Sequence, residues 1–150
     1  MDCSSYFVSS YLEARTRLQL LIKEIQAEDL SKRLGSSPNS VGFLLRHIGD
    51  VELLFSKNVF KQEFLHVKAQ TIIDGKDNGN WKNLSELVDY LSNSSNEVSK
   101  AIAIQKNSAW HEPITTKEFG TKTLAEAFGR IISHTAYHSG QIALIKKYGI

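Results

Sequence analysis

Four segments of the chain carry hydrophobic residues at intervals of three and four positions, which is the spacing of one face of a helix. They span approximately residues 5–27, 39–60, 83–106 and 123–148. Glycine- and proline-containing stretches at 35–38, 75–79 and 113–120 separate them. The pattern predicts four amphipathic helices, and therefore an all-α four-helix bundle.

The helix starts and the connectors refine this prediction. Asn39 or Ser40 is suited to cap the second helix, and Thr123 with Glu126 matches a capping box at the start of the fourth. Residues 114–119 are the one candidate for a short extended piece. The connectors 61–82 and 107–121 exceed the roughly two to eight residues usual between bundle helices. We expect the first connector to be long enough to cross the bundle.

Four aromatic residues lie in or beside these connectors: Phe64, Trp81, Trp110 and Phe119. We expect them to pack on the core and to hold the connectors in place. The alternative is that Trp110 and His111 form part of a pocket rim.

Three polar residues interrupt the predicted core-facing stripe of the fourth helix. The stripe consists of Ala127, Ile131, His134, His138, Gln141, Ile145 and Tyr148. Burying an imidazole or an amide without a partner costs about 1–3 kcal/mol. A histidine pair at positions i and i+4 can direct two ring nitrogens at one point, which is the first half of a metal site.

A third histidine lies on the predicted core face of the second helix. The rise from residue 39 to His47 is roughly 12 Å and that from residue 124 to His134 roughly 15 Å, so both lie near mid-helix. A single histidine on such a face is more often a core residue with a hydrogen-bond partner. Three at one level favour a metal site of His47, His134 and His138, whereas His66 and His111 are expected on the surface or in loops.

Three neutral imidazoles leave at least one coordination position open, as in catalytic metal sites. A divalent ion held there would lower the pKa of bound water toward about 7 or stabilise a thiolate. Nitrogen ligands suit zinc, nickel, iron or copper. Gln141 is expected either to orient a ligand or bound water or to bond to a neighbouring helix.

Residues beside the histidines are given simpler roles. Tyr137 lies off the stripe and is expected to pack in the core, with a catalytic role as the alternative. Asp50 and Glu52 are expected to face solvent or a helix boundary, although one of them could support a metal ligand or act as a base. Close helix packing is expected at the four glycines inside helices, with room for a substrate as the alternative: Gly42, Gly49, Gly129 and Gly140.

Composition narrows the classes of function. The 150 residues are 41% hydrophobic and 23% charged with a net charge of +2, which predicts one soluble domain spanning 1–150 and no nucleic-acid partner. The single cysteine, Cys3, provides neither an internal disulfide nor a thiolate metal site. Because neither a signal peptide nor a membrane span is recognisable, we expect a cytoplasmic protein without a membrane partner.

Two motifs resemble those of the DinB/YfiT-like family. Residues 40–48, SVGFLLRHI, resemble its second-helix motif, and residues 134–142, HTAYHSGQI, resemble its fourth-helix signature His-x-x-x-His-x-Gly-Gln. The resemblance covers essentially the whole chain. It implies an up-down-down-up bundle with 61–82 as the crossover, and a metal triad of His47, His134 and His138.

The resemblance also implies a class of function. Most members are described as metal-dependent enzymes, some relatives transfer low-molecular-weight thiols or isomerise thiol adducts, and homodimers are common. We therefore expect a metal-dependent hydrolase or thiol S-transferase with a small-molecule substrate, and with zinc or nickel, or else iron, as the ion. The alternatives are a non-catalytic metal-binding stress or sensor protein and a purely structural bundle.

Overall fold

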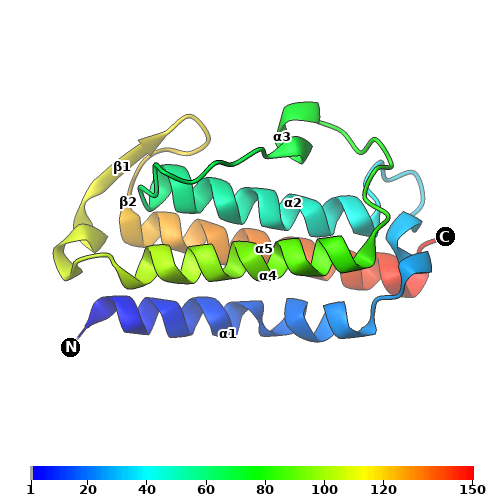
Figure 1. The fold of residues 1–150 in the computed structure, drawn as a ribbon, viewed down its shortest axis with the longest axis horizontal. Helices are drawn as coiled ribbons and strands as arrows, with labels where there is room; N and C mark the ends of the chain where they lie inside the picture. The colour runs from blue at the N-terminus through cyan, green and yellow to red at the C-terminus, as the bar shows by residue number, and fades with distance from the viewer. Residues whose placement is uncertain (1) are drawn as a thin grey trace.

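The computed structural model describes residues 2–150, which form five α-helices and two short β-strands (Figure 1). The helices are α1 (Cys3–Glu24), α2 (Val41–Leu54), α3 (Gln70–Asp74), α4 (Leu84–Ala103) and α5 (Leu124–Tyr148). The strands are β1 (Pro113–Thr116) and β2 (Gly120–Thr123), which pair in antiparallel orientation. The predicted, mostly helical fold is confirmed.

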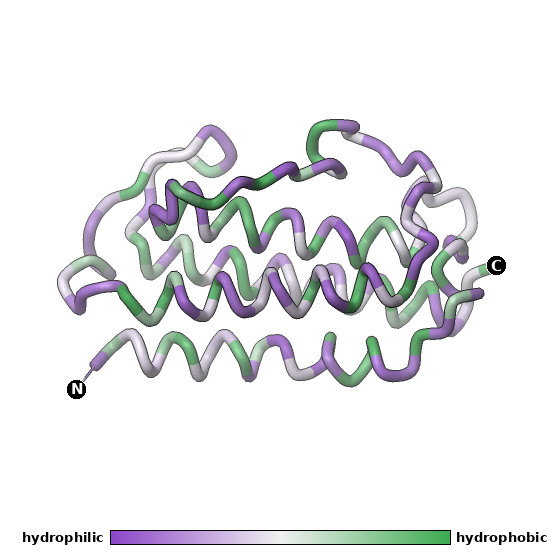
Figure 2. Tube along the Cα trace, in the orientation of Figure 1, coloured by the Kyte–Doolittle hydropathy of each residue, from purple (hydrophilic) through white to green (hydrophobic). Residues whose placement is uncertain are grey.

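The four long helices lie side by side. Each of α1 and α2 packs against both α4 and α5. The chain runs in one direction along α1 and α5 and in the opposite direction along α2 and α4 (Figure 1). Residues 61–82, which include α3, return along α2 to the end of the molecule where α4 begins (Figure 1). Hydrophobic and hydrophilic residues alternate along every long helix (Figure 2), as the amphipathic pattern requires.

The predicted helix starts agree with the observed caps. The Ser40 hydroxyl accepts a hydrogen bond from the backbone of Phe43, and Thr123 and Glu126 form the predicted capping box. The predicted ends are less accurate. The first helix ends at Glu24 instead of 27, the third at Ala103 instead of 106, and the second changes to a π-helical turn over Phe55–Val59. Helix ends are weakly specified because terminal turns adopt 3₁₀ or π geometry at little cost.

The connectors contain more structure than the sequence indicated. The predicted extended piece at 114–119 is part strand and part turn, because β1 ends at Thr116 and the chain turns before β2. Trp110 is buried and stacks on Phe7 with ring centres 3.9 Å apart, whereas His111 is exposed, so Trp110 covers the core as expected. The expectation for Phe64 is wrong, since 72% of this residue is exposed.

The buried hydrophobic residues form two clusters at opposite ends of the helices. One contains Phe55, Trp110 and Ile131, and the other contains Leu18, Leu44 and Ile142. A buried polar group lies between them, which we call the Glu52 cluster: Tyr11, Arg15, Glu52, Ser94 and Thr135. No helix within residues 2–150 is both long enough and apolar enough to cross a membrane.

Candidate metal centre

The contact between α2 and α5 brings the three predicted histidines together. His47 extends from α2, and His134 and His138 extend from α5. One ring nitrogen from each lies within 4.8 Å of the others. The Nε2 atoms of His47 and His134 are 3.2 Å apart, and the ring centres of His134 and His138 are 4.5 Å apart. We call this group the histidine cluster.

A hydrogen-bonded chain fixes the orientation of His47. The Thr71 hydroxyl donates to Oδ2 of Asp50 over 2.8 Å, and its oxygen lies 3.1 Å from Nδ1 of His47. Because the hydroxyl proton is directed at Asp50, the Thr71 oxygen accepts from the Nδ1–H of His47. Nε2 of neutral His47 therefore carries a lone pair and faces the cluster, as a metal ligand requires.

Gln141 orients His138 in the same way. Its Oε1 atom lies 2.6 Å from Nδ1 of His138. A carboxamide oxygen only accepts hydrogen bonds, so Nδ1 of His138 carries the proton and Nε2 carries the lone pair. Gln141 thus bonds to a candidate ligand on its own helix, instead of to a neighbouring helix as the alternative for this residue supposed.

His134 is incompletely paired. Its Nδ1 is the one buried side-chain nitrogen or oxygen atom within residues 2–150 that has no hydrogen-bond partner. A proton shared between Nε2 of His134 and Nε2 of His47 would still leave this atom unpaired. An unpaired buried polar atom costs about 1–3 kcal/mol, so the three rings do not satisfy one another fully.

The surroundings keep the rings neutral. Burial and the neighbouring His138 together lower the pKa of His47 to about 4, although the charge of Asp50 acts in the opposite direction. Burial, His138, His47 and Arg130 together lower the pKa of His134 to about 3. Burial also lowers the pKa of His138. Neutral imidazole is the form that binds a metal, so the cluster is in its ligand form at neutral pH.

The distances suit a divalent ion. Two nitrogens that each lie about 2.0–2.1 Å from zinc in tetrahedral geometry are about 3.4 Å apart, close to the 3.2 Å between the Nε2 atoms of His47 and His134. Three imidazole nitrogens would leave a position for a further ligand. The three-histidine site is therefore compatible with a divalent metal ion.

The expectation that Asp50 and Glu52 face solvent or a helix boundary is wrong, because both are completely buried. Asp50 accepts hydrogen bonds from Thr71, from the Tyr90 hydroxyl at 2.6 Å and from Nε of Arg46 at 2.8 Å. The alternative role fits Asp50, since this carboxylate supports His47 through Thr71. Sequence reasoning missed Thr71, which lies in a connector where no local pattern distinguishes it.

Two pockets adjoin the histidine cluster. The first, of about 290 Å³, is lined in part by Phe43, His47, Thr71 and His138 and is called the crossover pocket. The second, of about 540 Å³, is called the hairpin pocket. Its lining includes Phe55, Glu118, Arg130, Ser133, His134 and Tyr137. The expectation that Tyr137 packs in the core is wrong, since 65% of it is exposed.

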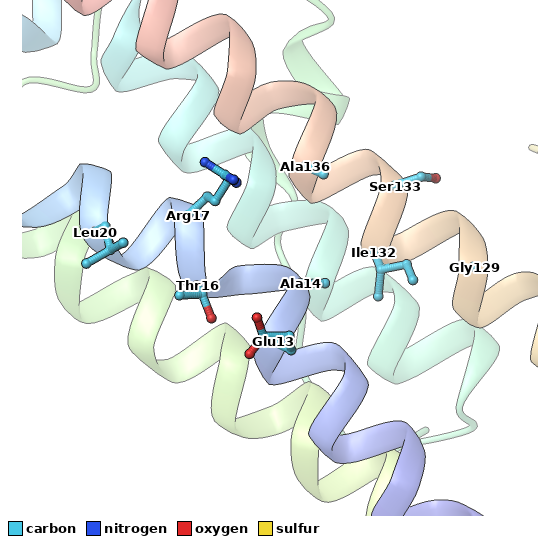
Figure 3. Close-up of a pocket in the computed structure, with 9 residues that line it drawn as sticks. All are labelled: Glu13, Ala14, Thr16, Arg17, Leu20, Gly129, Ile132, Ser133 and Ala136. Atoms are coloured by element: carbon cyan, nitrogen blue, oxygen red, sulfur yellow. The ribbon is translucent and has the colours of Figure 1, made fainter.

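A third pocket of about 660 Å³ lies between α1 and α5 and is lined by residues such as Arg17, Gly129 and Ala136 (Figure 3). A Cβ atom at Gly129 or Gly140 would meet no neighbouring atom within 4 Å, so close packing does not explain these glycines.

Close packing does hold for the two glycines of α2. A Cβ atom at Gly42 would lie 2.0 Å from the backbone oxygen of Trp81, and one at Gly49 would lie 2.7 Å from the ring of Tyr90. The missing side chains thus let the crossover and α4 approach α2 on either side of His47.

The exposed positions of His66 and His111 agree with the sequence prediction.

A family model for the DinB superfamily matches residues 10–142, a range that contains the whole histidine cluster. No curated protein gives a match to the chain. The chain belongs to the DinB superfamily, as its two motifs indicated.

Proposed function

We propose that this DinB superfamily member is a metal-dependent enzyme that holds a divalent ion through His47, His134 and His138. The reaction proposed is of the hydrolase or thiol S-transferase type, with a small-molecule substrate. One observation carries the proposal: three histidine nitrogens lie within 4.8 Å of one another beside two pockets. A purely structural group would be expected to complete its own hydrogen bonds, and His134 does not.

The ion would supply a Lewis acid that lowers the pKa of a water or thiol at its open position. The residues of the chain prepare that position. Thr71 and Gln141 each accept the Nδ1–H of a candidate ligand, which directs the Nε2 lone pairs of His47 and His138 inward. We propose zinc or nickel as the ion, with iron as a further candidate, because all three accept nitrogen ligands.

The proposal includes the arrangement of the long helices as an up-down-down-up four-helix bundle. The contacts of α1 and α2 with both α4 and α5 support it, as do the chain directions in Figure 1. In this arrangement the 61–82 crossover brings Thr71 to the side of α2 that carries His47, so the topology itself contributes to the site.

Metal analysis tests the first part of the proposal. Tag-free protein is dialysed against zinc or nickel, and its metal content and melting temperature are measured for the wild type, His134→Ala and the control His66→Ala. We expect about one ion per chain and a raised melting temperature for the wild type and His66→Ala, and neither for His134→Ala. A wild type that binds no ion and gains no thermal stability would contradict the metal site.

Turnover assays test the second part. The metal-loaded protein is assayed with activated esters and with electrophiles in the presence of low-molecular-weight thiols. Turnover by the wild type that is lost in His134→Ala supports the proposal that the protein is an enzyme. Stoichiometric metal without turnover across the panel would overturn it in favour of a non-catalytic metal-binding protein.

A further inference from the structure

The two pockets beside the histidine cluster differ in charge. The crossover pocket is lined by uncharged residues and by two of the neutral histidines. The hairpin pocket is lined by Arg130 and Glu118 and by His134. A charged group of a small molecule would therefore find a charged partner in the hairpin pocket only, as far as residues 2–150 define the two linings.

The position of Arg130 beside the histidine cluster is fixed by neighbouring residues. It lies one helical turn before His134 on α5, so the two side chains extend from the same face about 6 Å apart at their Cβ atoms. The Phe119 ring lies 5.6 Å from its guanidinium carbon and restrains it. Nη2 of Arg130 lies 3.2 Å from Oε1 of Glu118, in the turn between β1 and β2.

The Arg130–Glu118 pair is easily exchanged. Both side chains are about half exposed, at 45% and 59%. Ion pairs with this exposure stabilise a fold by at most about 1 kcal/mol. A ligand carboxylate that also gains contacts within the pocket can therefore replace Glu118 at the guanidinium.

We propose that the hairpin pocket binds the carboxylate group of the substrate at Arg130, and that Glu118 occupies this position in the free protein. The inference rests on the proposed function, since it takes the reacting end of the substrate to lie at the histidine cluster. Phe55 and Tyr137 add aromatic rings to the lining of the same pocket. The substrate class is thus a small molecule with a carboxylate a few bonds from its reactive atom.

Two small thiols, one ending in a carboxylate and the other in an uncharged hydroxyl, provide the probes. Cobalt-loaded protein is titrated with 3-mercaptopropionate and with 2-mercaptoethanol, and the thiolate-to-cobalt absorption band gives each affinity. The ratio of the two affinities is then compared between variants. This comparison cancels the differences between the two thiols in basicity and in intrinsic cobalt binding.

We expect the ratio to fall about fivefold in Arg130→Gln, the factor expected for the loss of one charge-assisted contact. Arg130→Lys should retain part of the ratio, and Glu118→Gln should raise it about twofold because the competing carboxylate is removed. Arg17→Gln, which removes a charge from the pocket between α1 and α5, is the matched control and should leave it unchanged. An unchanged ratio in Arg130→Gln would overturn the proposal.

A measurement on metal-free protein separates this proposal from the proposed function. Backbone amide NMR signals of residues 117–120 are followed during titration with 3-mercaptopropionate and with 2-mercaptoethanol. Shifts that only the carboxylate produces, and that Arg130→Gln abolishes, support the carboxylate site even when no cobalt band forms. Equal behaviour of the wild type and Arg130→Gln would overturn it, whatever the metal does.

Discussion

The Glu52 cluster and the histidine cluster each contain a residue of α2. They differ in how completely their polar atoms are hydrogen-bonded. The carboxylate of Glu52 accepts hydrogen bonds from Arg15 at 2.7 and 3.0 Å, from Tyr11 at 2.9 Å and from Ser94 at 2.6 Å. These donors come from α1 and α4, and the Thr135 hydroxyl of α5 adds a longer contact at 3.5 Å. The histidine cluster leaves Nδ1 of His134 unpaired and adjoins two pockets.

The difference distinguishes a group whose hydrogen bonds are complete from one that is incompletely paired and compatible with a divalent ion. Burying the charged Glu52 is compensated because each of its oxygens has partners. In the histidine cluster, Nδ1 of His47 and Nδ1 of His138 have partners, whereas Nδ1 of His134 has none. Burial alone therefore does not distinguish the two groups, whereas their hydrogen-bond partners do.

The largest expected effect is on the Glu52 cluster. Glu52→Gln leaves the buried Arg15 charge without a counter-charge, so the free energy of unfolding should fall by about 3 kcal/mol or more. Urea denaturation at pH 7 measures it. Glu97→Gln, which removes the exposed pair with Lys100, should cost less than about 0.5 kcal/mol. A loss below about 1 kcal/mol for Glu52→Gln would show that the cluster is not the stabilising group.

The second expected effect separates stability from metal binding. His134→Leu removes the unpaired nitrogen and one ligand together. The metal-free variant should unfold within about 1 kcal/mol of the wild type, because the loss of the hydrogen bond between Nε2 of His134 and Nε2 of His47 is offset by removal of the unpaired Nδ1. Its zinc affinity, measured by competition with a chromophoric chelator, should fall by a factor of about 100 or more. Strong destabilisation with metal affinity retained would reverse the roles of the two groups.

A smaller effect is expected at the support of His47. Thr71→Val keeps the shape of the side chain but removes the hydroxyl between His47 and Asp50. Zinc affinity should fall about tenfold, the low end of the range for partners that orient a metal ligand. Thr71→Ser restores the hydroxyl and should restore the affinity. Equal affinities for Thr71→Val and the wild type would show that the hydrogen bond does not prepare the site.

The smallest expected effect is on the acid stability of the metal-free protein. The pKa values of His47 and His134 fall from 6.5 to about 4 and about 3 on folding, so the unfolded chain takes up protons first. The free energy of unfolding is therefore lost as the pH falls from about 6.5 toward 4. Allowing for screening by solvent, we expect a loss of about 1 kcal/mol between pH 7 and 5.

Urea titrations at several pH values measure this loss, and His134→Leu should show a shallower dependence. The carboxyl groups of Asp29 and Asp77 have lowered pKa values, so their contributions are lost only at more acidic pH. A wild type with constant stability from pH 7 to pH 5 would contradict the assignment of the rings as neutral and buried.

The sequence predicted those features that depend on helical periodicity. Helical periodicity alone placed His134 and His138 on one face of the fourth helix and His47 on the core face of the second helix. Neither prediction needed the rest of the structure. The caps at Ser40 and Thr123 were equally local. The helical class and the meeting of the three histidines followed from these patterns.

The errors concern contacts made by segments distant in sequence. Asp50 and Glu52 are charged, and only the structure shows that Thr71 from the crossover and Arg15 from α1 cover them. Tyr137 has the hydrophobic character of a core residue, but α5 presents it to solvent beside the hairpin pocket. The open faces of Gly129 and Gly140 depend on how α1 lies against α5, which helix periodicity does not determine.

The distance along the chain between His47 and His134 has a consequence for how the molecule forms. These residues are 87 positions apart, and Thr71 lies 24 positions from His47. Each helix can form locally, but α5 must pack against α2 before the histidine cluster exists. The crossover must also return along α2 before Thr71 can bond to His47. Contacts of such high sequence separation form slowly, after loop closure has been overcome. Metal capture during refolding would therefore report the completion of the tertiary structure.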